Sequence, residues 1–272
     1  MTNNQVTPQA DRNFDPIADH FAKKVYGGLK GQIRLAVLTH DLSEALQTLP
    51  QDRPLKILDV GAGLAQISLT LAHAHHVTVN DISVNMLNKA KQSAIELGVL
   101  DKVRFLACPY QELFDKLQGE KFDLILCHAL LEWLGSPSEI LSLFDEFLTP
   151  QGKLSLCFYN PVSLIYRNLI MGNFYQLDTP RPADQKSLTP NNPVSPADVE
   201  QWLSDHHYKI DLRSGIRTFW DYTPVKRGGL TNPEDVINME LKYARQMPFM
   251  LMGRYLHIIA SRNSSPPCNF NK

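Results

Sequence analysis

Short apolar runs alternate with helical stretches along the middle of the chain. Five apolar segments predict β-strands over 56–60, 76–80, 103–108, 122–128 and 153–159. Between them lie segments predicted as helices, over about 62–73, 84–97, 111–118 and 137–148. Strands that alternate with helices are typical of βαβ units, so the sequence predicts an α/β fold with a mostly parallel sheet.

The second half of the chain follows a different pattern. The helix over 137–148 should end near Pro150, which cannot continue it, with Gly152 in the left-handed conformation that closes a helix. Residues 161–195 contain a proline-rich stretch without a clear period, which indicates an inserted lid or loop. A helix should then begin with Pro196 after Ser195. Further strands are predicted over 208–213, 216–222 and 255–260, around a helix over 232–246. The late strands suggest an antiparallel hairpin at the sheet edge, and the first 50 residues should form two helices on the carboxyl edge of the sheet.

Composition excludes several classes of protein. The chain has 272 residues, of which 43% are apolar and 20% charged, as in ordinary globular proteins. Its longest apolar run, residues 124–131, is far shorter than the roughly 20 residues of a membrane span, and the polar first 12 residues show no secretory signal. The four cysteines are widely spaced, so we expect reduced thiols in a cytoplasmic protein and no metal site.

Charge is divided unevenly between the two halves of the chain. Residues 1–150 carry 13 basic and 18 acidic side chains, whereas residues 151–272 carry 14 and 10, which gives net charges of −5 and +4. A polyanionic partner should therefore meet the C-terminal half.

The most informative segment joins the first predicted strand to the helix after it. Residues 58–63 read Leu-Asp-Val-Gly-Ala-Gly, and the glycines let the backbone approach a ligand that would collide with a Cβ atom. Nucleotides bind at this position in doubly wound folds. The dinucleotide fingerprint needs a third glycine where this chain has Gln66, so a nicotinamide cofactor is disfavoured. A plain strand-to-helix connection is the alternative reading of the turn.

Asp81 ends the second predicted strand, where an acidic side chain can accept hydrogen bonds from ribose hydroxyls. Every adenosine cofactor offers such a diol, so Asp81 does not choose between cofactors. The alternative role for Asp81 is to cap the next helix, for which Ser83 is the nearer candidate.

Residues 59–63, Asp81 and Phe122-Asp123 together resemble the class I, Rossmann-like S-adenosylmethionine-dependent methyltransferases. The resemblance implies a mixed seven-stranded sheet with order 3-2-1-4-5-7-6 and an antiparallel last strand. It also implies that S-adenosylmethionine is the cofactor. Its implied binding residues are Gly61, Ala62, Gly63 and Asp81, with Tyr110 and Gln111 at the adenine and His128 at the methionine end.

Segments along nearly the whole chain resemble bacterial methyltransferases that esterify 5-carboxymethoxyuridine at the wobble position of tRNA. They include residues 11–15, 30–34, 128–133, 158–160, 216–222 and 253–257. Ala62 departs from this family, which usually has glycine there. The resemblance implies the tRNA anticodon stem-loop as partner and assigns Arg34 to the carboxylate of the cofactor, with an exposed surface charge as the alternative. It divides the chain into a helical cap (1–50), a cofactor-binding core (51–160), a lid (161–195) and a tRNA-facing part (196–272). Oligomeric state is not indicated.

Methyl transfer to a carboxylate needs no general base, because a carboxyl group with a pKa of about 4 is ionised at neutral pH. The site must instead align the reacting groups and exclude water. Arginine holds a carboxylate through two parallel hydrogen bonds. Arg217 is therefore predicted to bind the substrate carboxylate or an anticodon phosphate, supported by Tyr159, Tyr222 and Arg254. Residues 219–222 could instead pack within an edge strand.

Other functions remain open at this point. A methyltransferase for a small acid or phenol would use the same cofactor site, and a carboxymethyl transferase would use a carboxylated cofactor on tRNA. A nicotinamide-dependent oxidoreductase is disfavoured by Gln66, and a non-catalytic nucleotide-binding module is the remaining alternative.

Overall fold

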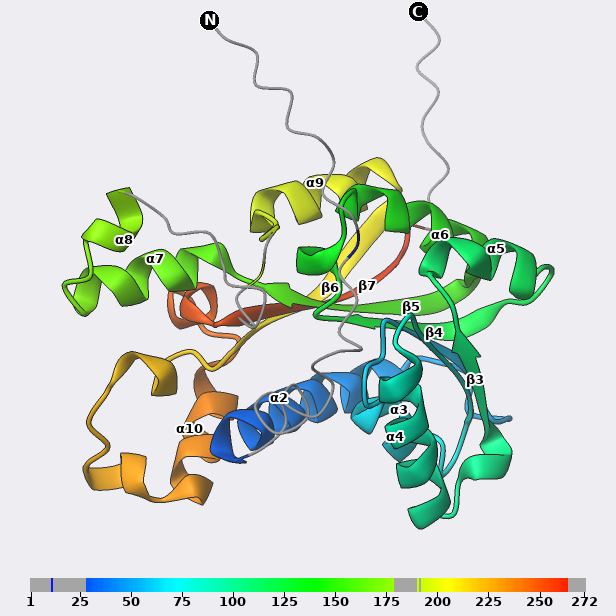
Figure 1. The fold of residues 1–272 in the computed structure, drawn as a ribbon, viewed down its shortest axis with the longest axis horizontal. Helices are drawn as coiled ribbons and strands as arrows, with labels where there is room; N and C mark the ends of the chain where they lie inside the picture. Colours follow the sequence, from blue (N-terminus) through cyan, green and yellow to red (C-terminus); the bar gives the residue numbers. More distant parts are fainter. Residues whose placement is uncertain (1–10, 12–27, 179–189, 191, 264–272) are drawn as a thin grey trace, which may run out of the picture.

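A mixed seven-stranded sheet forms the centre of the computed structural model, which describes residues 11, 28–178, 190 and 192–263 (Figure 1). The strand order is β3-β2-β1-β4-β5-β7-β6, as predicted. The first five strands pair in parallel, and β7 is antiparallel to both β5 and β6. The strands are β1 Lys56–Val60, β2 His76–Asp81, β3 Val103–Ala107, β4 Phe122–His128, β5 Leu148–Tyr159, β6 Tyr208–Ile216 and β7 Tyr255–Arg262.

Helices cover both faces of this sheet (Figure 1). One face is covered by α2 (Gly28–Gln47), α3 (Gln66–Leu71), α4 (Val84–Glu96) and α10 (Pro233–Tyr243). The other is covered by α5 (Leu113–Lys116), α6 (Ile140–Phe147) and α9 (Pro196–Asp205). Two further helices, α7 (Pro161–Ile170) and α8 (Tyr175–Asp178), extend beyond the end of β5. No helix in the described part of the chain is both long and apolar enough to cross a membrane.

The central strand β4 shows why the core has two layers. Successive side chains of a strand point to opposite faces, and β4 is apolar at nearly every position. Leu124 and Leu126 pack in the layer beneath α2, α3 and α4, whereas Ile125 and Cys127 pack in the layer that includes α5, α6 and α9. Cys127 is a buried free thiol, as are Cys108 and Cys157, while Cys268 lies outside the described residues.

Two predicted helix starts are confirmed by their caps. Ser195 precedes α9, its hydroxyl accepts from the backbone N–H of Ala197 at 3.2 Å, and Pro196 is the first helical residue. Ser83 caps α4 by accepting from the N–H of Met86 at 3.1 Å, so this role falls to Ser83 as predicted.

The predicted end of the helix before β5 is wrong. Helix α6 ends at Phe147, and β5 already begins at Leu148, which is buried and pairs with Phe122 of β4. Gly152 does not take a left-handed conformation. Glycine leaves room for a neighbouring side chain instead: a Cβ atom there would lie 2.7 Å from Cδ1 of Leu148, which would have to shift.

The predicted strand over 216–222 is also wrong. Strand β6 ends at Ile216, and Arg217 takes a left-handed conformation with φ 60°, which turns the chain out of the sheet. Trp220–Tyr222 then forms a 3₁₀ turn. The buried carboxylate of Glu240 accepts the backbone hydrogen bonds of this segment, so they are not available to a neighbouring strand.

The segment predicted as a lid or loop begins with a regular helix. Asn160 caps α7 by accepting from the N–H of Val162 at 3.1 Å, and α8 follows it. Residues 179–189 and 191 lie outside the described residues, and the lid remains a prediction. Of the two helices predicted near the N-terminus, α2 is described, while the first would fall mainly within residues 12–27, outside the described part.

Candidate active site

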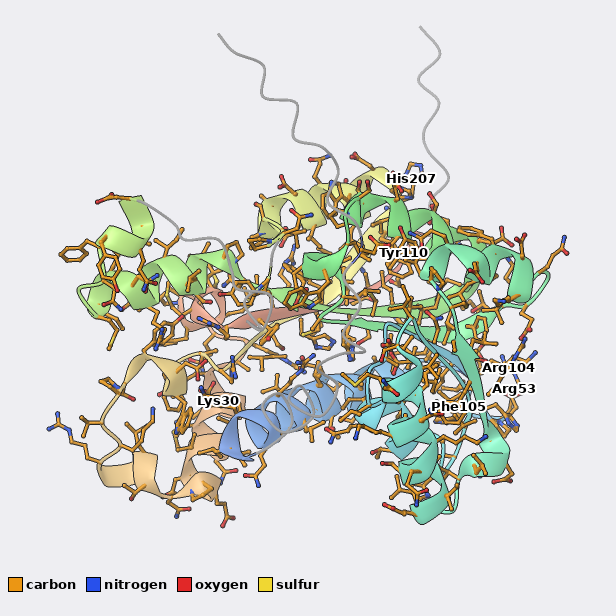
Figure 2. The ribbon with its side chains drawn as sticks, viewed as in Figure 1. Lys30, Arg53, Arg104, Phe105, Tyr110 and His207 are labelled. Atoms are coloured by element: carbon orange, nitrogen blue, oxygen red, sulfur yellow. The ribbon has the colours of Figure 1, made fainter. Side chains whose placement is uncertain are left out.

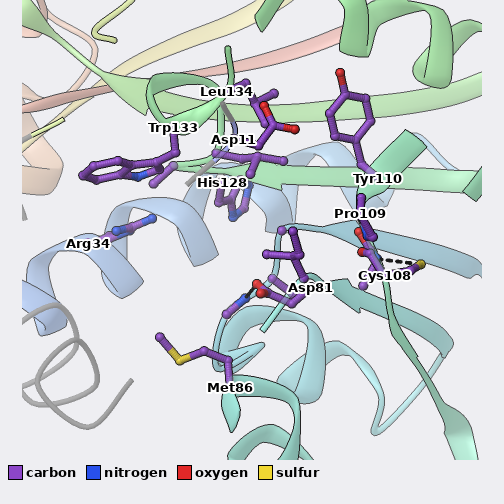
Figure 3. Close-up of a pocket in the computed structure, with 17 residues that line it drawn as sticks. Asp11, Arg34, Asp81, Met86, Cys108, Pro109, Tyr110, His128, Trp133 and Leu134 are labelled. Carbon is purple, nitrogen blue, oxygen red and sulfur yellow. Dashed lines mark hydrogen bonds between the residues drawn. The ribbon is translucent and has the colours of Figure 1, made fainter. Parts of the chain in front are cut away.

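A pocket of about 780 Å³, including its open mouth, lies at the carboxyl ends of β1 to β4 (Figure 3). This is the edge at which nucleotides bind in open α/β sheets. Seven of the predicted cofactor residues line it: Arg34, Gly61, Ala62, Gly63, Asp81, Tyr110 and His128. The pocket is elongated, with Arg34 and Trp133 at one end and Tyr110 at the other (Figure 3).

The glycine turn forms the floor of this pocket. Gly61 and Gly63 both have left-handed backbones, with φ 65° and 57°. A Cβ atom on Gly61 would lie 2.7 Å from Cδ1 of Leu130, so glycine is required there for conformation and for space. Ala62 does not have a positive φ, and its N–H donates to the carbonyl of Asn80 at 2.9 Å. The turn therefore accommodates alanine where the family usually has glycine.

Asp81 organises the loops around the pocket. Its Oδ2 accepts from the N–H of Gly63 at 2.7 Å, and its Oδ1 accepts from the N–H of Ser83 at 2.8 Å. One carboxylate thus ties the glycine turn after β1 to the loop after β2. Carboxylate oxygens are also the acceptors that ribose hydroxyls require.

The third strand supplies the far end of the pocket. Tyr110 is buried beside Pro109, and burial raises the pKa of its hydroxyl to about 12, so it stays protonated. Gln111 lies next to the pocket, not in its lining, and donates to Asp11 Oδ2 at 3.0 Å. Asp11 lines the pocket and accepts from the N–H of Gly135 at 2.9 Å.

Arg34 lies on α2 and is only 5% exposed, so the alternative of an exposed surface charge is wrong. Its guanidinium stacks over the ring of Tyr255, 5.0 Å from the centroid. Arg217 approaches the same ring at 5.5 Å. Tyr255 therefore joins a pocket-lining arginine to the arginine predicted to hold the substrate.

Tyr159 and Tyr255 form the centre of a second cluster. They face one another across β5 and β7, with their rings edge-on at 5.8 Å. The guanidinium of Arg254 lies over the ring of Tyr159 at 5.1 Å. Three arginines therefore surround one pair of tyrosine rings beside the pocket, and the predicted residues Tyr159, Arg217 and Arg254 are brought together.

Tyr222, the fourth predicted residue, borders this cluster. Its hydroxyl donates to the carbonyl of Met252, and its ring lies edge-on to Tyr166 of α7 at 5.2 Å. Burial raises the pKa of Tyr222 to about 12, partly offset by the positive charge of Arg254. Tyr222 thus connects α7 to the loop that precedes β7.

Asp221 is a site residue that the sequence did not single out. Its Oδ2 lies 3.1 Å from Nη2 of Arg217, and its other oxygen lies 3.9 Å from Nζ of Lys30. The carboxylate is nearly buried, so the ion pair with Arg217 is shielded from solvent. Asp221 fixes one edge of the guanidinium.

Several buried donors around this cluster lack a hydrogen-bond partner among the described residues. They are the hydroxyl of Tyr159, Nε of Arg217 and Nε1 of Trp220. Burial raises the pKa of Tyr159, so its hydroxyl remains a donor at neutral pH. Unmade hydrogen bonds of buried groups are costly, and unused donors within a cluster of three arginines fit an anionic ligand.

Lys226, beside Arg227 in the segment after Tyr222, packs against the cluster instead of extending into solvent. Lys226 stacks over the ring of Trp220 at 3.9 Å and donates to the carbonyl of Thr223 at 2.5 Å. Partial burial lowers the pKa of Lys226. The side chain holds the turn after Tyr222 in place.

The fold and this pocket define a class I, Rossmann-like methyltransferase. A family model described as a methyltransferase domain matches residues 51–203. The chain is similar to magnesium protoporphyrin IX methyltransferase from Synechocystis with bound SAH, with a TM-score of 0.63 and 17% identity over 92% of this chain and 96% of that one. It is also similar to an S-adenosylmethionine-dependent methyltransferase from Mesorhizobium loti, with a TM-score of 0.58 and 18% identity over 86% and 100% of the two chains.

Sequence relatives identify the family of this chain within that class of methyltransferases. The chain is 37% identical to tRNA 5-carboxymethoxyuridine methyltransferase of Escherichia coli K12, over 94% of this chain and 98% of that protein. It is 27% identical to ubiquinone biosynthesis O-methyltransferase of Xylella fastidiosa, over 66% and 70% of the two chains. The chain belongs to the tRNA 5-carboxymethoxyuridine methyltransferase family.

Proposed function

We propose that this protein transfers a methyl group from S-adenosylmethionine to the carboxylate of 5-carboxymethoxyuridine at the wobble position of tRNA, forming a methyl ester. Full-length similarity to the E. coli enzyme supports the reaction. The observation that carries it within the structure is the group of buried donors and arginines around Tyr159 and Tyr255. Buried hydrogen-bond donors and guanidinium groups together can bind a carboxylate.

The pocket residues fit the proposed cofactor. Gly61 and Gly63 leave room for its close approach, Asp81 can accept from the ribose hydroxyls, and Arg34 can hold the methionine carboxylate. Tyr110 lies at the opposite end of the pocket from Arg34, where the adenine would bind (Figure 3). When bound, S-adenosylmethionine supplies an electrophilic methyl group on a positively charged sulfur.

The arginine cluster supports a mode of substrate binding that needs no catalytic base. Asp221 binds Nη2 of Arg217 and leaves Nε of that guanidinium without a partner among the described residues. Arg217 Nε and the hydroxyl of Tyr159 are then available to donate to a carboxylate, which is already ionised. Because a hydrogen bond to a charged group contributes about 1.5–3 kcal/mol, two such donors orient the nucleophile.

Surface features near the cluster fit an RNA partner. Phe174 and Tyr175 of the α7–α8 region are each 59% exposed, and Tyr166 of α7 contacts Tyr222. Exposed aromatic rings can stack on the unpaired bases of an anticodon loop. Lys30, at the start of α2, lies at this end of the molecule, whereas Arg53 and Arg104 lie at the opposite end (Figure 2). The reaction is proposed to take place in the cytoplasm.

Nucleoside mass spectrometry of tRNA tests the proposal. In a strain that lacks the gene, the methyl ester should disappear and free 5-carboxymethoxyuridine should accumulate. Normal levels of the ester would contradict the proposal. Purified protein should also bind tRNA with an affinity that falls steeply with salt, because phosphate contacts release counterions. Weak salt dependence together with no measurable affinity for tRNA would instead favour a small acid or phenol as substrate.

A further inference from the structure

One tyrosine ring on β7 contacts an arginine of each binding site. The guanidinium of Arg34, which lines the cofactor pocket, lies over the ring of Tyr255 at 5.0 Å from the centroid. The guanidinium of Arg217, which is predicted to hold the substrate carboxylate, lies over the same ring at 5.5 Å. The cofactor site and the substrate site therefore share one aromatic side chain.

The topology of the sheet places this ring between the two sites. Strand β7 lies between β5 and β6, and Tyr255 pairs with Tyr159 on one side and with Ile216 on the other. Arg217 follows Ile216 directly and leaves the sheet through its left-handed backbone. Arg34 comes from α2, which contacts both β6 and β7. Segments that are far apart in the chain therefore meet at Tyr255.

Both guanidinium groups have little contact with water. Arg34 is 5% exposed, and the side chain of Arg217 is 14% exposed. Two like charges near one another repel, whereas the electron-rich face of an aromatic ring attracts a cation, most strongly where water is excluded. Asp221 balances the charge of Arg217 and holds its Nη2 atom at 3.1 Å. Tyr255 adds an attraction to both arginines that an aliphatic side chain could not supply.

The ring of Tyr255 is itself held by its neighbours. Tyr159 meets it edge-on, with the centroids 5.8 Å apart and the ring planes at 88°, which is a favoured arrangement of two aromatic rings. Arg254 lies over the ring of Tyr159 at 5.1 Å. Tyr255 also packs against a buried cluster that includes Val37 and Ile216. A ring fixed in this way can hold two guanidinium groups in fixed positions.

We propose that Tyr255 is a positioning residue shared by the two sites: its ring fixes Arg34 for the methionine carboxylate of the cofactor and Arg217 for the carboxylate of the substrate. The inference rests on the proposed function, which assigns these two carboxylates to the two arginines. One side chain then controls the binding of two different ligands, and it does so through their carboxylate groups alone.

Tyr255→Leu and Tyr255→Phe separate the effect of the π face from that of apolar volume. Leucine removes the π face, so calorimetry should show an affinity for S-adenosylmethionine that is weaker by about three- to tenfold. Methylation assays should show a similar fall in kcat/KM for tRNA. Phenylalanine keeps the π face, so Tyr255→Phe should match the wild type in both measurements. Tyr243→Leu is the control, because it removes a ring on α10 that lies under Lys242 at 5.6 Å, and it should change neither value.

Ligands that lack the carboxylates distinguish positioning from general damage to the fold. 5′-Methylthioadenosine contains the adenosine part of the cofactor without its carboxylate, and tRNA with an unmodified wobble uridine lacks the substrate carboxylate. Tyr255→Leu should bind both ligands as tightly as the wild type, because neither offers a carboxylate to Arg34 or Arg217. Weaker binding of these ligands in Tyr255→Leu would overturn the inference.

A fluorinated ring at position 255 gives an independent test if Tyr255→Leu fails to fold. The ring of 3,4,5-trifluorophenylalanine is close in shape to that of phenylalanine, but fluorine withdraws electron density from its face, so it attracts cations weakly. Relative to Tyr255→Phe, cofactor affinity and kcat/KM for tRNA should both fall. Unchanged values, or a fall confined to one of the two ligands, would overturn the inference alone. Wild-type protein that does not bind S-adenosylmethionine would overturn the proposed function and this inference with it.

Discussion

Glu240 holds the backbone of Thr218, whose N–H donates to Glu240 Oε2 at 2.6 Å. The same carboxylate accepts from the Thr218 hydroxyl at 2.9 Å and from the N–H groups of Phe219 and Trp220 at 3.3 and 3.1 Å. It is wholly buried beneath the segment that begins with the left-handed Arg217. A side chain on α10 thereby fixes the turn that presents Arg217 and Asp221.

Glu240→Gln should weaken the use of tRNA. The NH₂ group of glutamine would face backbone N–H donors, so the turn would loosen and Arg217 would lose its fixed position. We expect a higher KM for tRNA and a lower Tm, with unchanged affinity for S-adenosylmethionine. Steady-state kinetics and calorimetry measure the two effects. Glu234→Gln, on the exposed first turn of the same helix, is the control, and an unchanged KM in Glu240→Gln would contradict this role.

Arg217→Lys tests whether the guanidinium holds the substrate carboxylate. Lysine keeps the positive charge but loses the Nε donor and the planar fork. The loss of one or two charged hydrogen bonds of about 1.5–3 kcal/mol each predicts a fall in kcat/KM of at least about tenfold. Methylation assays on tRNA measure this. Activity equal to the wild type would show that charge alone suffices.

Asp81→Ala should abolish cofactor binding, because it removes the acceptor for the ribose and frees the N–H groups of Gly63 and Ser83. Arg217→Ala should bind the cofactor normally and lose turnover. Calorimetry with S-adenosylmethionine on both variants separates the roles. Asp101→Ala removes an exposed carboxylate just before the start of β3, at the strand end opposite the pocket, and should behave as wild type. If Asp81→Ala bound the cofactor normally and Arg217→Ala did not, Asp81 would be a substrate residue and Arg217 a cofactor residue.

Asp59 should make stability depend on pH. It is buried, it accepts from the Ser68 hydroxyl at 2.6 Å, and burial raises its pKa to about 7. Between about pH 4 and pH 7 the folded state keeps a proton that the unfolded state has lost. The Asp59 contribution to the free energy of unfolding therefore falls as pH rises through this window and is level above it.

Urea unfolding of Asp59→Asn and wild type at about pH 5 and about pH 8 isolates this contribution. The pKa of Glu132 is also raised to about 7 by burial, but its effect is common to both proteins. The variant should gain stability relative to the wild type at the higher pH. A difference that does not change with pH would contradict the raised pKa of Asp59.

Local patterns were sufficient to predict the parallel half of the sheet. Strands such as 122–128 are mostly apolar, and a glycine turn directly after a strand is typical of a nucleotide pocket. The order of the seven strands came from resemblance to a family, since no local pattern encodes which strands become neighbours. The helix caps at Ser83 and Ser195 were also predictable, because capping depends on adjacent residues.

The cluster of arginine and tyrosine side chains around Tyr159 and Tyr255 could not be predicted from local sequence patterns. Tyr255 meets Tyr159 only through the register of β5 and β7, and Glu240 reaches Thr218 only because α10 packs beneath the turn. Residues 216–222 were apolar and aromatic enough to predict a strand, but the buried carboxylate of Glu240 takes their hydrogen bonds. The tertiary contact therefore overrides the local preference.

Formation of a methyl ester on a tRNA carboxylate can be measured directly. Purified protein should be incubated with tRNA that carries 5-carboxymethoxyuridine and with S-adenosylmethionine whose methyl group is deuterated. The wobble nucleoside should gain one CD₃ group, and mild alkali should remove it, because an ester hydrolyses whereas methyl groups on base carbon or ribose oxygen do not. A label that survives alkali, or no label on the wobble nucleoside, would contradict the proposed function.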